Sequence, residues 1–275
     1  MKSDRAETVL SEEAVFLCAA KAGLEPVYPA EMETLVSFLV NALYLFGGQS
    51  LAVPGGAPEG VTAELTRLGH RVRTGLPLGS GRQGRSGAEG ARRAGQGSNG
   101  NASGNTGGQA QADRIFVPHA LGQGSDAEIL ASLRGLRGSL RPGGLVCFHV
   151  FDRDRAWERA GSRNARVDGI EARLRVEFDP ASGRLSARAT PAGEARAVFR
   201  NPALALASTS VKTWNLGELA GLLRSAGLVL ERAYGDWEGG SPGHTASGRL
   251  IVVAARPRKR GNPRQSAQEA RPQRA

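Results

Sequence analysis

The chain has 275 residues, 40% hydrophobic side chains and a formal net charge of +10. This length allows one large α/β domain or two small ones, and the apolar share is enough to bury a core. Neither an uninterrupted run of eighteen apolar residues nor the apolar region of a signal peptide occurs, which excludes an ordinary transmembrane helix. We therefore expect a cytoplasmic protein that makes no contact with a membrane.

The positive charge is concentrated in two segments. Residues 79–112 carry a net charge of +3 and residues 256–275 carry +6, while the remainder is close to neutral. Both segments lack the apolar side chains that would offset the entropy of ordering them, so we predict that both are disordered. The tail either solubilises the protein or makes weak, nonspecific contacts with nucleic acid or an acidic protein. No aromatic residues interleave its arginines, so the tail by itself does not indicate base stacking.

Metal binding is not predicted. Cys18 and Cys147 both lie in apolar stretches, and the four histidines are scattered without metal-ligand spacing. The two cysteines are expected to be reduced core thiols.

Hydrophobic periodicity and turn residues predict most elements of the chain. The elements expected before the Gly-rich segment are helices over 12–22 and 31–44, a strand over 50–53, a helix over 59–68 and a strand over 70–73. Those expected after it are a strand over 114–117, a helix over 127–140 capped by Ser125-Asp126, a strand over 145–151, a β-hairpin insert over 164–212, a helix over 216–225, and strands over 228–234 and 249–254. Repeated strand–turn–helix units imply an α/β, three-layer sandwich, a Rossmann-like fold with a mainly parallel sheet.

The domain organisation follows from these elements. Residues 1–46 are expected to form N-terminal helices that pack on the core, and residues 47–255 form the main α/β domain. That domain contains the Gly-rich segment 79–112 and the antiparallel β insert 164–212, and the basic tail 256–275 follows it.

Four stretches, in this order, resemble class I S-adenosylmethionine (SAM)-dependent methyltransferases of the small-molecule type. They are the helix, strand, glycine turn and second strand over 38–72; Asp113-Arg114-Ile115-Phe116-Val117 with its helix and the turn Leu140-Arg141-Pro142-Gly143-Gly144-Leu145; the helix over 218–228; and the closing hairpin Tyr234-Gly235-Asp236-Trp237-Glu238-Gly239 with the strand over 247–254. The resemblance implies a seven-stranded sheet in the order 3-2-1-4-5-7-6, with strand seven antiparallel. It also implies SAM as the cofactor, bound near Val53, Pro54, Gly55, Gly56, Pro118 and His119.

The cofactor motif departs from the family pattern at several positions. The family usually carries an acid at the end of its first strand, where this chain has Ala52, and its glycine loop is replaced by Gly55-Gly56-Ala57-Pro58. The acid that binds the ribose is missing near 75–77, and the third strand would fall within 79–112. The site is therefore expected to be degenerate.

Two functions remain open. One is methyl transfer from SAM to a small molecule held by the loop 118–124 and the insert 164–212, for which no catalytic side chain is identified. The other is a catalytically inactive methyltransferase fold kept as a binding or scaffold module. Nucleic-acid binding as the main function is less favoured, because the predicted folded part is close to neutral.

Overall fold

The computed structural model describes residues 32–46, 49–54, 60–74, 111–118, 121–167, 170–192, 207–243 and 248–258. The predicted helix at 12–22, the Gly-rich segment up to residue 110 and the tail beyond residue 258 lie outside these ranges. The described part of the chain contains the following elements: α2 (Met32–Ala42), β1 (Ser50–Val53), α3 (Val61–Arg67), β2 (Arg71–Thr74), β3 (Ala112–Phe116), α4 (Asp126–Ser139), β4 (Leu140–Asp152), the 3-10 helix η1 (Arg153–Arg159), β5 (Gly161–Val167), β6 (Ile170–Asp179), β7 (Arg184–Pro191), β8 (Ala207–Trp214), α6 (Leu216–Ala226), β9 (Val229–Tyr234) and β10 (Arg249–Ala255).

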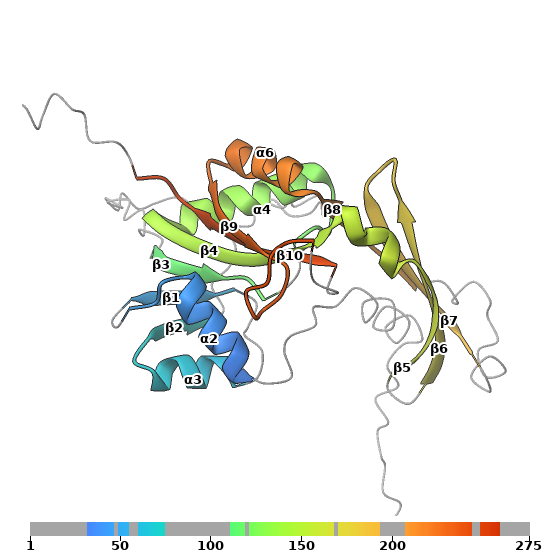
Figure 1. Ribbon diagram of the computed structural model, residues 1–275, viewed down its shortest axis with the longest axis horizontal. Coiled ribbons are helices and arrows are strands. Elements are labelled where there is room, and N and C mark those ends of the chain that lie inside the picture. The colour runs from blue at the N-terminus through green and yellow to red at the C-terminus, as the bar shows by residue number, and fades with distance from the viewer. Residues whose placement is uncertain are drawn as a thin grey trace, which may run out of the picture.

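The main sheet has the order β2-β1-β3-β4-β10-β9 (Figure 1). Strands β1, β2, β3 and β4 are parallel, and β10 runs antiparallel to both β4 and β9. This arrangement confirms the expected order 2-1-4-5-7-6 with an antiparallel penultimate strand. The expected third strand would fall within 75–110, outside the described residues.

Alternate residues of each strand face opposite layers of helices, as the pleat requires. Ala52, Ile115 and Val146 belong to the apolar cluster that includes α4 and α6, whereas Phe116 and Cys147 belong to the cluster that includes α2 and α3. In Figure 1, α4 and α6 lie above the sheet and α2 and α3 lie below it. The three layers predicted from the sequence are therefore confirmed.

The insert is larger than the single hairpin predicted. It is a four-stranded antiparallel sheet in the order β5-β6-β7-β8 that begins at Gly161, and it has an apolar cluster of its own. Strand β8 continues beside β4, where Phe151 and Asp152 pair with Thr213 and Trp214. The outer strands were missed because the segments GSRNARV and ASTSVKTW lack clear apolar alternation.

Local signals fix the ends of two helices. Ser125 and Asn215 each form a capping box, with Glu128 and Glu218 respectively. Helix α6 ends at Gly227, whose φ of 75° is a left-handed conformation that glycine adopts without strain. None of the described helices is long and apolar enough to cross a membrane.

Candidate functional site

Parallel strands end together, and this gives the sheet a carboxyl edge where β1, β3 and β4 finish. Ligands of open α/β sheets bind at this edge, near the point where the strand order reverses. In this chain that point lies between β1 and β3, because the chain proceeds from β1 to β2 on one side and from β3 to β4 on the other. The ends of β1 and β3 are therefore the expected centre of a ligand site.

The structure brings three of the six predicted cofactor residues to this edge. Val53 and Pro54 end β1, and Pro118 follows β3 by two residues, with all three buried. The side chain of Val53 belongs to the apolar cluster of α2 and α3, so its side chain is part of the core and does not face a ligand. Gly55, Gly56 and His119 lie outside the described residues.

Carboxylates are missing from the described residues that end β1 and β2. Ala52, at the position where the family carries an acid, is 1% exposed in the cluster of α4 and α6. Strand β2 ends in the exposed pair Arg73-Thr74. A carboxylate in place of Ala52 would be buried among apolar side chains, which costs several kcal/mol for an unpaired charge.

Asp152 is the carboxylate at the end of β4. Its Oδ1 accepts a hydrogen bond from the Asp154 backbone at 3.1 Å, and its own N–H donates to the Gly248 carbonyl at 3.2 Å. Burial raises the pKa of Asp152 above its usual value. The side chain caps η1, so its contacts account for a structural role.

An aromatic cluster joins the turn after β9 to helix α2. The ring of Trp237 lies edge-on to Phe38, Phe116 and His149, with centroid distances of 5.3, 6.2 and 6.1 Å. Phe38 also packs edge-on against Tyr234 at 5.1 Å. His149 is 1% exposed, and its Nε2 lies 3.5 Å from the Pro118 carbonyl oxygen. These contacts connect the ends of β3, β4 and β9 to α2.

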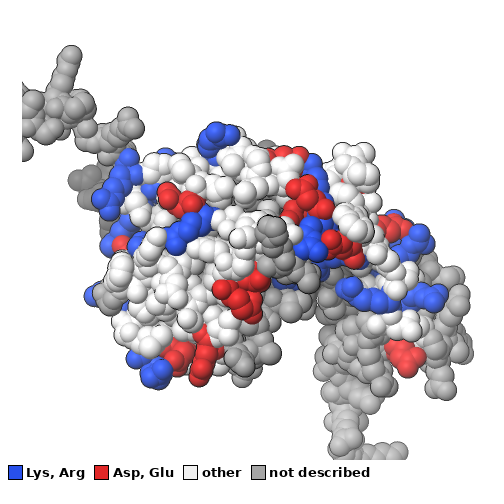
Figure 2. Space-filling view, in the orientation of Figure 1, with Lys and Arg blue, Asp and Glu red and all other residues white. Residues whose placement is uncertain are grey.

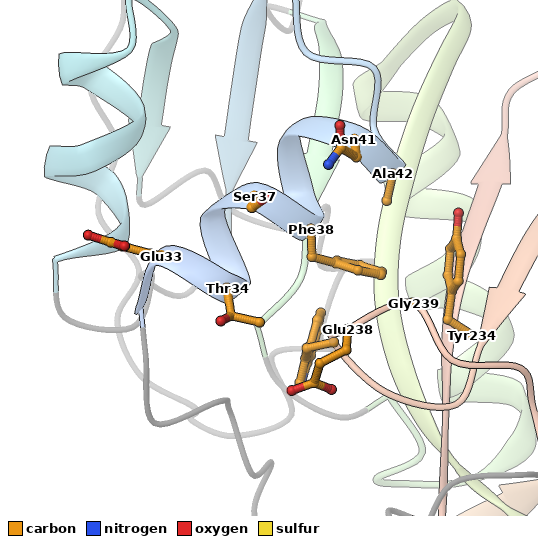
Figure 3. A pocket seen from close by; sticks show the side chains of 10 residues that line it. Glu33, Thr34, Ser37, Phe38, Asn41, Ala42, Tyr234, Glu238 and Gly239 are labelled. Atoms are coloured by element: carbon orange, nitrogen blue, oxygen red, sulfur yellow. The ribbon is translucent and has the colours of Figure 1, made fainter.

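A pocket of about 490 Å³ opens between α2 and the turn after β9 (Figure 3). Its volume lies in the range of small-molecule sites. The lining residues are Glu33, Thr34, Ser37, Phe38, Asn41 and Ala42 from α2, Tyr234 at the end of β9, and Trp237, Glu238 and Gly239 from the turn. The pocket thus has an aromatic wall and a polar wall.

The turn that forms one side of the pocket is held by its own hydrogen bonds. Asp236 Oδ1 accepts from the backbone N–H groups of Glu238 at 3.1 Å and Gly240 at 2.7 Å. The Gly235 N–H donates to the Gly240 carbonyl at 2.7 Å, which closes the turn. The carboxylates among the residues that line the pocket are those of Glu33 and Glu238.

The two segments predicted to hold a substrate do lie against each other. The Lys212 N–H of β8 donates to the Gly122 carbonyl at 2.8 Å, and Arg184 of β7 donates to the Gly124 carbonyl. The pocket described above, however, is lined by α2 and the turn after β9, which sequence reasoning did not assign to the site. A substrate role for the loop 118–124 and the insert therefore stays a prediction. No group of metal-ligating side chains occurs in the part of the chain that the structure describes.

Comparison with known proteins gives a match in structure alone. No family model and no curated protein sequence matches the chain. Among solved structures, the methyltransferase CcbJ from Streptomyces caelestis aligns with a TM-score of 0.51 and 17% identity, over 86% of this chain and 95% of that one. A SAM-dependent methyltransferase from Clostridium acetobutylicum aligns with a TM-score of 0.50 and 8% identity, over 83% and 93% of the two chains. The chain therefore has the class I methyltransferase fold.

Proposed function

We propose that this methyltransferase fold transfers a methyl group from SAM to a small-molecule acceptor, and that the acceptor binds between α2 and the turn after β9. The observation that carries the proposal is the pocket of about 490 Å³ beside the end of β9. Strand β9 runs in the same direction as β1, β3 and β4. The pocket at the end of β9 therefore lies at the same carboxyl edge of the sheet as the ends of those three strands. A cofactor at the strand ends would therefore lie next to an acceptor in the pocket.

The described residues fit the cofactor only in part. SAM supplies an electrophilic methyl group, and the carboxylate that would hold its ribose is missing from the described ends of β1 and β2. A charged hydrogen bond contributes about 1.5–3 kcal/mol, so this loss weakens binding by roughly 10- to 150-fold. We therefore expect micromolar or weaker affinity.

The pocket residues have a defined part in this proposal. Phe38, Tyr234 and Trp237 form an apolar wall, while Thr34 and Ser37 supply hydroxyl groups from α2. Such a site can act by holding the acceptor atom in line with the methyl group, because proximity and orientation alone can supply about 7–11 kcal/mol of the barrier. No side chain is assigned as a catalytic base.

The test is isothermal titration of the full chain with SAM and with its demethylated product. Heat that fits a dissociation constant in the micromolar range supports the proposal. A folded protein, confirmed by its thermal transition, that gives no heat up to millimolar ligand contradicts it. That outcome favours the second candidate, an inactive methyltransferase fold that serves as a binding module, which the buried Ala52 already favours.

Filling the pocket tests the acceptor site separately. Ser37 is exposed on α2 and lines the pocket, so Ser37→Trp places a large ring inside it. We expect SAM binding to be unchanged and the release of demethylated cofactor, measured over a panel of small acceptors, to fall at least tenfold. Ala63→Trp, on the exposed face of α3, is the matched control and should leave both readings unchanged. If Ser37→Trp and Ala63→Trp change the release of demethylated cofactor equally, the acceptor does not bind in this pocket.

A further inference from the structure

The amino edge of the sheet, opposite the pocket, collects arginines from distant parts of the chain. Strand β3 begins there at Ala112, β4 begins at Leu140 and β10 ends at Ala255, and the three strands are neighbours. In Figure 1, β10 ends at the left of the molecule, and Figure 2 shows Lys and Arg side chains at that end. We call the four arginines at this edge, Arg137, Arg141, Arg256 and Arg258, the amino-edge cluster.

The cluster consists of Arg137, Arg141, Arg256 and Arg258, and a chain of contacts holds it together. Arg256 donates to the carbonyls of Arg137, at 3.1 Å, and of Leu140. The Arg256 carbonyl accepts from the Gly143 N–H at 2.7 Å, and Arg258 lies directly over Gly143.

The remaining two arginines extend the cluster to either side. Arg137 donates from Nε to the Gly227 carbonyl at 3.2 Å, which carries the cluster toward the end of α6. Arg141 donates to Asp113 at 3.0 Å, and the Arg141 side chain is still 57% exposed.

The four arginines of the cluster outnumber the negative groups directly beside them. Asp113 is the carboxylate that contacts the cluster. The ends of α4 and α6 also lie at this edge, and a helix C-terminus is equivalent to roughly half a negative charge. One carboxylate and two helix ends together offset about two of the four guanidinium charges. The remaining positive charge favours an anionic partner.

Two exposed aromatic side chains lie at the same edge. Tyr44 and Phe46 follow α2 and are 48% and 66% exposed. Arg114, beside Asp113, donates to the Leu43 carbonyl, and Arg232 stacks on the Tyr44 ring with its Cζ 4.2 Å from the centroid. Folding therefore places aromatic rings beside arginines, although no aromatic residue stands among the arginines of the tail.

The two basic segments of the sequence also join the body at this edge. The segment 79–112, with a net charge of +3, leads into β3, and the segment 256–275, with +6, follows β10. Because β3 and β10 both flank β4, the two junctions are one strand apart. The two segments that carry most of the net positive charge are thus attached to the sheet next to the amino-edge cluster.

We propose that the amino edge binds single-stranded nucleic acid. The guanidinium groups of Arg141 and Arg258 match phosphate oxygens in geometry and charge, and Phe46 offers a face on which a base stacks. This combination favours a single strand over a duplex, whose bases are not free to stack. It also favours nucleic acid over an acidic protein, since an acidic protein has no need of an exposed aromatic ring such as Phe46 at the same edge. The site lies on the edge opposite the proposed acceptor pocket, so it is independent of methyl transfer.

The charge part of the proposal is tested with the full chain and a fluorescent 20-nucleotide oligo-uridine, by anisotropy over a range of salt concentrations. We expect binding at low salt and a plot of log K against log salt that becomes shallower by about 1.4 in the double variant Arg141→Gln, Arg258→Gln, since each lost phosphate contact removes about 0.7. The matched control, Arg173→Gln with Arg188→Gln, removes the same charge from exposed positions of β6 and β7 and should leave the slope unchanged.

The stacking part is tested with Phe46→Ala. The expected loss of affinity for oligo-uridine is about fivefold or more, with the salt slope retained. Trp157→Ala removes another exposed ring, 64% exposed on η1, and should not change the affinity. A thermal transition for each variant confirms that it is folded.

Four results would overturn the proposal, and three of them come from the oligo-uridine measurements. The first is absence of oligo-uridine binding at 50 mM salt. The second is an equal change in the slope of log K against log salt for the Arg141/Arg258 and Arg173/Arg188 double variants. The third is equal affinity of Phe46→Ala and Trp157→Ala for oligo-uridine. Binding to vesicles containing phosphatidylserine without binding to oligo-uridine would also reject it, in favour of an anionic membrane surface.

Discussion

At the scale of single residues, Asp113 shows how one carboxylate of β3 links the beginnings of β1 and β4. Its Oδ2 accepts from the Ser50 backbone N–H at 3.0 Å and from the Ser50 hydroxyl at 2.8 Å, and its Oδ1 accepts from Arg141. Burial raises the pKa of Asp113, but the hydrogen bonds from Ser50 and the charge of Arg141 outweigh it and hold that pKa below its usual value. The charged form is therefore favoured in the folded protein.

We predict that Asp113→Asn lowers the free energy of unfolding by about 1.5–3 kcal/mol at pH 7. Because the pKa of Asp113 is lower in the folded state than in the unfolded state, its stabilisation is complete above roughly pH 5 and is lost as the pH falls through the folded-state value. The difference between variant and parent in urea unfolding should thus shrink toward pH 3. Asp126→Asn, at a carboxylate that is 70% exposed, should cost less than about 0.5 kcal/mol. A pH-independent cost of Asp113→Asn would show that its charge is not the cause.

At the scale of elements, α2 is attached to the sheet by aromatic packing at one end and by a backbone contact at the other. Phe38 contacts both Tyr234 and Trp237, and Arg114 donates to the Leu43 carbonyl just after the helix ends. The same aromatic contacts form the wall of the proposed acceptor pocket. Stability and pocket shape therefore depend on the same side chains.

We predict that Trp237→Ala lowers the free energy of unfolding by about 3–5 kcal/mol, since its ring is 6% exposed and leaves a cavity between α2 and the sheet. Urea unfolding followed by circular dichroism measures this change. Trp157→Ala, which removes a ring that is 64% exposed, should stay within about 0.5 kcal/mol of the parent. Similar costs for the two tryptophans would contradict the packing described for α2.

At the scale of the whole molecule, the described residues form a three-layer body and an antiparallel sheet with its own core. The insert sheet β5–β8 packs its apolar face on Phe151 and Ala156, and it joins the main sheet where two residues of β8 pair with the end of β4. In contrast, β10 pairs with β4 over seven residues. The insert is thus joined to the main sheet by a much shorter ladder.

We predict that native-state hydrogen exchange gives lower opening free energies for the amides of β6 and β7 than for those of β4 and β10. A short ladder and a separate apolar cluster allow the insert to open while the main sheet stays closed. Phe151→Ala, which removes a ring that is 1% exposed from the insert's cluster, should increase this difference. Equal protection of both sheets would show that they open as one unit.

The sequence predicted the main sheet well because its strands are short apolar runs bounded by turns. The run over Leu145 to Phe151 indicates a strand buried on both faces, and Ser125 with Glu128 marks the start of a helix. The structure puts Val53, Pro54 and Pro118 at the carboxyl edge and buries all three, and a cofactor-binding role for them stays a prediction. Strands β5 and β8 could not be predicted, because their sequences do not alternate.

The sequence alone determined the fold class, through local periodicity, and the departures from the family's cofactor motif, through residue identity, whereas the strand order came from the resemblance to that family. The tertiary structure decided the pocket between Phe38 and Trp237 and the amino-edge cluster, in which Arg256 contacts the Arg137 carbonyl. In both places the partners are far apart along the chain: Phe38 lies on α2 and Trp237 follows β9, and Arg137 and Arg256 are 119 residues apart. Such contacts arise from the order in which parallel strands stack, and no local pattern of residues reports them.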